Sequence, residues 1–181
     1  MAVKDSGSRF GGLSIFNHWI MAALVVGMLA FGLYVEDLPK GEEAVALIGI
    51  HKSIGVLVLV FAVWRILWRM YNGFPAAVGA FKAWEKFVAK AVHYGLLLGV
   101  LVMALAGYVH SAAGGHFITF FGLFPLPGLP ENKALSSVAG EVHEIVGKLL
   151  MILIALHVLA ALKHHFIERD ATLKRMLGRA D

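Results

Sequence analysis

Four long apolar stretches, each with few charged residues, make up most of this chain. A helix needs about 20 apolar residues to cross a hydrocarbon core about 30 Å thick, and each stretch is at least that long. Inside lipid, a backbone satisfies its own hydrogen bonds only as a helix or a closed barrel. The stretches therefore predict four transmembrane helices, over residues 14–34, 44–68, 87–109 and 142–166.

The composition agrees with a membrane protein and excludes several chemistries. Of the 181 residues, 59% are hydrophobic and 15% are charged, whereas soluble domains carry about 25% charged residues. The chain has no cysteine, which excludes disulfides, covalent c-type haem attachment, iron–sulfur ligation and thiolate zinc sites. The formal charge of +4 does not indicate nucleic-acid binding, because the basic residues cluster beside apolar stretches. We expect one all-α membrane domain over residues 1–181.

The distribution of lysine and arginine predicts the orientation, because cytoplasmic loops carry an excess of basic residues. Twelve of the sixteen basic side chains fall on the side that holds both termini: Lys4, Arg9, Arg65, Arg69, Lys82, Lys86, Lys90, Lys163, Arg169, Lys174, Arg175 and Arg179. We therefore expect both termini, and a short polar tail over 167–181, to be cytoplasmic. The first span is expected to be retained, because no small-residue cleavage site follows it.

Two histidines on the fourth span predict cofactor sites at two depths. His143 and His157 are fourteen residues apart, so they leave the same helix face about 21 Å apart at about 1.5 Å per residue. Ionisable residues inside membrane helices are rare and mark functional sites. His51, near the start of the second span, is expected at the depth of His143. Because imidazole is an axial ligand for haem iron, we predict two b haems stacked across the bilayer, the outer one held by His51 and His143.

Depth alone does not identify the inner partner of His157. His18 on the first span and His93 on the third both lie about 24 Å below the outer ends of their helices, at about 1.5 Å per residue. A membrane histidine can also bond one helix to another, and for His93 we favour that role or contact with a quinone. Two histidines on each iron would leave no open coordination position, which suits electron transfer rather than oxygen activation.

Cationic side chains accompany these histidines. Arg65 follows His51 by fourteen residues, so it shares that helix face near the inner depth. A guanidinium fork suits a haem propionate, although the side chain can instead snorkel to the lipid headgroups. Lys52 and Lys148 are candidate contacts for the outer propionates, and they would also attract an anionic donor.

The other histidines and the longest connection carry weaker information. His110 and His116 are expected in solvent, and His164 and His165 at a helix end where basic residues suit the dipole. A metal-transport interpretation of the histidines lacks carboxylates at membrane depth. The connection over 110–141 holds too much glycine and proline for a fifth span. Its aromatic residues favour a cap in the outer interface, or an ordinary amphipathic loop.

The chain resembles the four-helix prokaryotic cytochrome b561 family through four segments: FNHWI, IHKSIGVLVLVFAVWRILWR, AKAVHYGLLLGVLVMALAGYV and VHEIVGKLLMILIALHVLAALKHHFIERDATLKRML. It is similar also to the cytochrome b subunits of nickel–iron hydrogenases and formate dehydrogenases. In this family the fourth helix supplies one ligand to each of two b haems, the first helix the inner partner and the second the outer. The resemblance therefore implies His18 with His157 and His51 with His143.

The closest likeness within the family is to its short stand-alone members. These imply a superoxide:ubiquinone oxidoreductase of the respiratory chain in the bacterial inner membrane, which oxidises superoxide or another small donor at the outer face. No catalytic side chain is assigned beyond the cofactor ligands. The alternative is a membrane-anchor cytochrome b subunit that carries electrons between the quinone pool and a partner dehydrogenase or reductase. A redox partner protein or a homodimer is compatible with either function.

Overall fold

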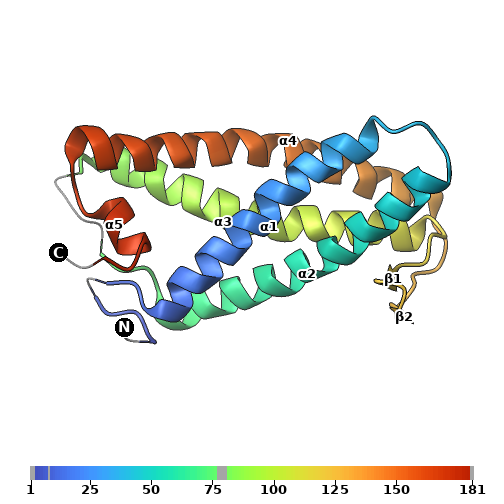
Figure 1. The fold of residues 1–181 in the computed structure, drawn as a ribbon, viewed down its shortest axis with the longest axis horizontal. Helices are drawn as coiled ribbons and strands as arrows, with labels where there is room; N and C mark the ends of the chain where they lie inside the picture. Colours follow the sequence, from blue (N-terminus) through green and yellow to red (C-terminus); the bar gives the residue numbers. More distant parts are fainter. Residues whose placement is uncertain (1–2, 8, 77–80, 180–181) are drawn as a thin grey trace.

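The computed structural model describes residues 3–7, 9–76 and 81–179 as a bundle of long helices (Figure 1). The four long helices are α1 (Gly12–Glu36), α2 (Glu42–Asn72), α3 (Ala83–Ala113) and α4 (Lys133–Lys163). Each is long and apolar enough to cross a membrane, which confirms the predicted all-α fold with four spans. Helices α2, α3 and α4 have 31 residues each, about 46 Å of helix, so they are longer than a hydrocarbon core of about 30 Å requires.

Helix α4 begins at Lys133 rather than near residue 142. Its start is set by Asn132, whose side-chain oxygen accepts the backbone N–H of Leu135 at 3.0 Å, a contact typical of a helix N-cap. Hydropathy detects only the part of a helix that lies in lipid, so the polar first turns of α4 escaped it. After Lys163 the chain continues as a π-helical turn, His164–Glu168.

Each long helix packs against the next one in the sequence: α1 contacts α2, α2 contacts α3, and α3 contacts α4. Helix α1 crosses the bundle obliquely (Figure 1). Large apolar side chains such as Val60 and Leu159 are well exposed, as expected where lipid replaces water as the solvent. The buried core is small and contains Met21, Val25, Met28, Val58, Ala62, Val100, Met103, Ala104 and Leu150.

The two ends of the bundle carry different structures (Figure 1). One end, the tail end, holds the segment before α1 and a short helix, α5 (Thr172–Met176), in the C-terminal tail. The other end, the hairpin end, holds two antiparallel strands, β1 (Thr119–Phe120) and β2 (Phe124–Pro125). The connection expected as an interfacial cap or loop therefore contains a small β-hairpin. Its turn uses Phe121 and Gly122 at φ 47° and 75°.

Candidate functional site

Two histidines from different helices face each other at the hairpin end. His51 lies on α2 and His143 on α4, with ring centroids 6.2 Å apart and ring planes at 81°. Both residues are half-buried. The structure thus brings together the two residues predicted for the outer site, and we call them the hairpin-end pair.

A backbone contact orients the ring of His143. Its Nδ1 lies 2.8 Å from the carbonyl oxygen of Met103 on α3. A carbonyl only accepts, so Nδ1 carries the hydrogen and Nε2 keeps its lone pair, the form in which histidine binds metals. Gly107 makes the approach possible, because a Cβ at this position would lie 2.8 Å from Nδ1.

Packing rather than a hydrogen bond orients the ring of His51. Its Nδ1 is buried and has no hydrogen-bond partner among the described residues. The ring lies 5.8 Å from that of Phe31, and a Cβ on Gly32 would lie 3.3 Å from Cε1. A buried polar atom without a partner is unusual in a folded protein.

A cavity of about 1330 Å³ lies between the hairpin-end pair and the hairpin. It is larger than the roughly 300–1,000 Å³ of a typical small-molecule site. Lys52 and Lys148, predicted to lie near this site, both line it. Lys148 forms an exposed ion pair with Glu144 at 2.5 Å, whereas Lys52 has no carboxylate partner in the part of the chain that the structure describes.

Three histidines meet nearer the tail end, His18 from α1, His93 from α3 and His157 from α4. The ring centroids of His18 and His157 are 6.2 Å apart, and those of His93 and His157 are 5.2 Å apart. When two imidazoles bind opposite sides of one metal at about 2.0–2.1 Å, with roughly 1.1 Å from nitrogen to ring centre, the ring centres are about 6.3 Å apart. The distance between His18 and His157 matches this opposite-side arrangement, and the distance between His93 and His157 is about 1 Å shorter.

His93 is oriented by its own helix. Its Nδ1 lies 2.6 Å from the carbonyl oxygen of Ala89, one turn earlier, and its ring centroid lies 6.2 Å from that of Phe74. The Nδ1 hydrogen is therefore used within α3, and Nε2 keeps its lone pair. His93 lies beside His157, as its depth predicted. Its ring is closer to that of His157 than the ring of His18 is.

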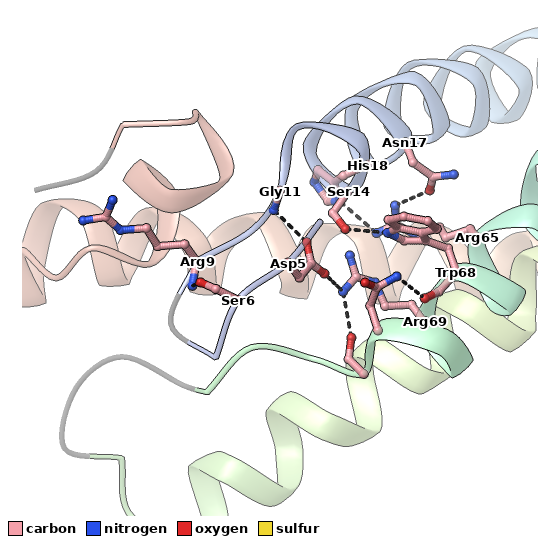
Figure 2. Close-up of polar contacts among 12 residues, drawn as sticks. Asp5, Ser6, Arg9, Gly11, Ser14, Asn17, His18, Arg65, Trp68 and Arg69 are labelled. Carbon is pink, nitrogen blue, oxygen red and sulfur yellow. Dashed lines mark hydrogen bonds and ion pairs between the residues drawn. The ribbon is translucent and has the colours of Figure 1, made fainter. Parts of the chain in front are cut away.

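Arg65 contacts His18 directly (Figure 2). One guanidinium nitrogen, Nη1, donates to the side-chain oxygen of Asn17 at 2.8 Å, and Nη2 lies 3.1 Å from Nδ1 of His18. The guanidinium only donates, so Nδ1 of His18 accepts in this contact and Nε2 carries the hydrogen. Nε2 of His18 would bind a metal only after Arg65 leaves Nδ1 and the hydrogen moves there. Both partners are neutral groups, and Asn17 is 1% exposed. Neither partner balances the positive charge of Arg65, which lies beside the tail-end histidines.

A buried ion pair closes the tail end (Figure 2). Arg69 binds Asp5 at 2.8 Å, with side-chain exposures of 6% and 3%. The other oxygen of Asp5 accepts the backbone N–H of Gly11 at 2.7 Å, and the guanidinium lies over the rings of Phe10 and Phe74. We did not predict this pair, because Arg69 gave only an orientation cue. The lone acidic residue in the basic N-terminal segment was the available hint.

Four histidines lie outside both clusters: His110, His116, His164 and His165. His110 is exposed, yet its Nδ1 donates to the carbonyl oxygen of Ser136 at 2.8 Å. At the tail end, His164 contacts the carboxylates of Glu168 and Asp170. The group resembles a set of metal ligands, but Glu168 already binds Lys163 at 2.6 Å. Direct hydrogen bonds therefore account for this cluster.

Comparison with known proteins gives a family that spans almost the whole chain. The family described as prokaryotic cytochrome b561 matches residues 9–179. Cytochrome b561 homolog 2 of Escherichia coli is 35% identical over 99% of this chain and 97% of its own length, and homolog 1 is 30% identical over 95% and 98%. A probable superoxide oxidase CybB of Yersinia pestis is 25% identical over 93% of this chain and 96% of its own length.

Proposed function

The chain belongs to the prokaryotic cytochrome b561 family, and we propose that it carries electrons across the membrane through two b haems. Haem b, which the family implies, supplies reversible one-electron chemistry when bound. The protein's contribution is to hold the group, orient its ligands and control access to it.

The observation that carries this proposal is the shared spacing of two histidine pairs. His51 and His143 are 6.2 Å apart, and so are His18 and His157. Each distance suits one metal between two imidazoles. Helix α4 contributes one histidine to each pair, as the family resemblance implies. We therefore propose that these four residues would hold the two haems, His51 with His143 and His18 with His157.

Three cations are assigned to the propionates or to an anionic donor. Arg65 has two neutral partners, so a propionate would supply its missing negative charge. Lys52 fits the same role at the hairpin end. Lys148 attracts an anion less strongly, because its charge is already balanced by that of Glu144. Lys52 is accordingly the main residue we assign to attracting an anion.

We infer that superoxide is the donor at the hairpin end and ubiquinone the acceptor nearer the tail end. Two superoxide anions release two electrons and become two oxygen molecules, and a quinone takes both electrons with two protons to form a quinol. Lys52, which lines the cavity without a carboxylate partner among the described residues, and the relative named as a probable superoxide oxidase support this donor. His93, with its free Nε2 beside His157, is the residue we assign to hydrogen bonding or proton transfer at the quinone.

The proposed setting is the bacterial inner membrane, with the hairpin end facing outward and both termini in the cytoplasm. The support is the excess of basic residues at the tail end, which includes Arg69, Lys163 and Arg175. Under this orientation the cavity beside Lys52 lies at the outer side of the membrane, where the proposed donor would be oxidised.

A second function rests on the exposed hairpin. Phe117 and Leu123 are 79% and 76% exposed, and an apolar tip of this kind suits a protein landing surface. The chain would then be a membrane anchor that passes electrons between a partner enzyme and the quinone pool. Copurification with a redox subunit would favour this function over oxidation of a small donor.

The first test is a haem count on the detergent-purified chain. Reduced-minus-oxidised spectra and haem b per polypeptide are measured for the wild type and for His157→Ala. We expect about two haems per chain in the wild type and about one in the variant. A colourless wild type, or an unchanged ratio in the variant, contradicts the proposal. Steady oxidation of superoxide by the isolated two-haem chain, coupled to ubiquinone reduction, then separates the enzyme from the carrier.

A further inference from the structure

The hairpin between α3 and α4 is attached to the bundle at its base and at its tip. At the base, the backbone N–H of Asn132 donates to the carbonyl of Ala113 at 2.9 Å. Also at the base, the hydroxyl of Tyr108 donates to the carbonyl of Pro127 at 2.5 Å. At the tip, the attachment is the side chain of Ser53 on α2. The base is therefore tied to its own connecting helices, and the tip to a third helix.

Ser53 is buried, with 1% of its surface exposed, and its hydroxyl both donates and accepts. Oγ accepts the backbone N–H of Phe121 at 3.0 Å. It lies 3.3 Å from the carbonyl oxygen of Thr119 and 2.9 Å from that of Gly49, so its one hydrogen serves one of them at a time. A two-stranded hairpin alone is marginally stable in water, and these bonds supply stability that its two strands lack.

The same hairpin forms one wall of the cavity at the hairpin end. Thr119, Phe121 and Gly122 line the cavity together with His51 and His143. Ser53 is two residues from His51 along α2, so the bond that holds the tip is built into the helix that carries a proposed ligand. A change in tip position alters the approach to the histidine pair without touching either histidine.

We propose that Ser53 is a positioning residue that holds the hairpin against α2 and so restricts redox partners at this site to small molecules. The inference rests on the proposed function, because it takes the hairpin-end pair as a haem site. The restriction is steric, since the wall presents backbone and apolar side chains rather than charge. With the tip released, bulkier partners approach the pair more closely.

The first readout follows the hairpin itself. Hydrogen exchange of the Phe121 amide is measured on the purified full chain, for the wild type, Ser53→Ala and Ser53→Thr. We expect exchange about tenfold faster in Ser53→Ala, which corresponds to about 1.4 kcal/mol, in the range of a lost hydrogen bond. Ser53→Thr keeps the hydroxyl and is expected to restore slow exchange. Equal exchange in Ser53→Ala and the wild type overturns the proposal.

The second readout is size selectivity. The reduced protein is mixed in stopped flow with ferricyanide, a small oxidant, or with ferric cytochrome c, a protein-sized one. Ser53→Ala is expected to raise the rate with cytochrome c several-fold more than the rate with ferricyanide. Equal changes with both oxidants, or no change, overturn the restriction to small molecules.

Ser136→Ala is the matched control for both readouts. Ser136 lies on α4 near the same end and donates to the carbonyl of His110 at 2.8 Å, away from the hairpin tip. It loses the same hydroxyl, and it is expected to leave Phe121 exchange and the rate ratio unchanged. If Ser53→Ala binds two haems but the ratio of its rates with cytochrome c and ferricyanide equals that of the wild type, only this inference is contradicted. Absence of haem in the wild type contradicts the proposed function as well.

Discussion

The two ends of the bundle hold histidine pairs of equal spacing in different surroundings. At the hairpin end the pair borders a large cavity, and a backbone carbonyl orients the ring of His143. At the tail end His18 contacts the guanidinium of Arg65. Arg69, one turn further along α2, forms the buried ion pair with Asp5 (Figure 2). Helix packing sets the spacing in both places, whereas the surroundings differ in access and charge. The hairpin end thus opens into a large cavity, whereas the tail end is distinguished by the Arg65 guanidinium and by a buried ion pair.

The strongest test of this comparison removes one histidine at each end, a proposed ligand at the hairpin end and a proposed non-ligand at the tail end. His143→Ala is expected to lower haem content from about two per chain to about one and to leave the tail-end site occupied. His93→Ala is expected to keep both haems and to slow ubiquinone reduction, because the His93 ring is about 1 Å closer to His157 than two imidazoles on opposite sides of one metal would be. Haem quantification with low-temperature spectra checks both variants. Loss of a haem in His93→Ala would mean that His93, rather than His18, is the inner ligand.

The next largest effect is expected at the tail-end ion pair. Arg69→Ala leaves Asp5 buried without its partner, a change that typically costs about 3–5 kcal/mol of unfolding free energy. Thermal unfolding in detergent measures it. The double variant Asp5→Leu/Arg69→Met is expected to recover much of the loss, because no charge remains unpaired.

The exposed ion pair at the hairpin end is the control for that experiment. Lys148→Ala breaks the contact between Lys148 and Glu144, whose side chains are both more than half exposed. Exposed ion pairs contribute little to stability, so the unfolding midpoint is expected to change little. If Arg69→Ala and Lys148→Ala lower the unfolding midpoint equally, the tail end is no more tightly closed than the hairpin end.

Charge at the cavity is expected to affect rates rather than stability. Lys52→Gln should slow the reaction with superoxide several-fold at low salt, and the difference should shrink as salt screens the attraction. Lys148→Gln should change the rate less, since Glu144 already neutralises that lysine. Rate constants across a range of ionic strengths check both variants. A larger effect from Lys148 would reverse the assigned roles.

The smallest expected effect lies in the C-terminal tail. Burial raises the pKa of the Asp170 carboxyl, but hydrogen bonds from Thr172 and His164 outweigh it and leave the pKa below its ordinary value. This carboxylate therefore stabilises the fold above pH of about 3.9, and the contribution is lost as pH falls through the lowered value. Acid unfolding curves for the wild type and Asp170→Asn should converge at low pH. Curves that stay parallel throughout would contradict this.

Hydropathy and helical periodicity predicted the parts of the molecule that repeat along the chain. The four spans follow from apolar length, and the alignment of His51 with His143 follows from counting residues along two helices. These properties depend on one helix at a time, so the sequence contains them directly. For His157, by contrast, depth left two candidate partners, His18 and His93, because depth along a helix gives no distance between helices.

Contacts between a side chain and a distant backbone group escaped prediction. The carbonyl of Met103 bonds to His143 only because α3 and α4 approach closely at Gly107. In the sequence, Ser53 is an ordinary small residue of a membrane helix. Its bond to the backbone N–H of Phe121 depends on where the hairpin folds. Such pairings depend on loop conformation and on interhelical distance, and neither leaves a periodic pattern in the sequence.

One rigid element, α4, carries a histidine of each pair, and this limits how the chain can evolve. Inserting one residue between His143 and His157 would turn the second histidine by about 100° around the helix axis. One site would then lose its ligand even if every other residue were kept. The connections between helices carry no such limit, so a change in loop length is expected to be tolerated where an insertion or deletion in this fourteen-residue interval is not.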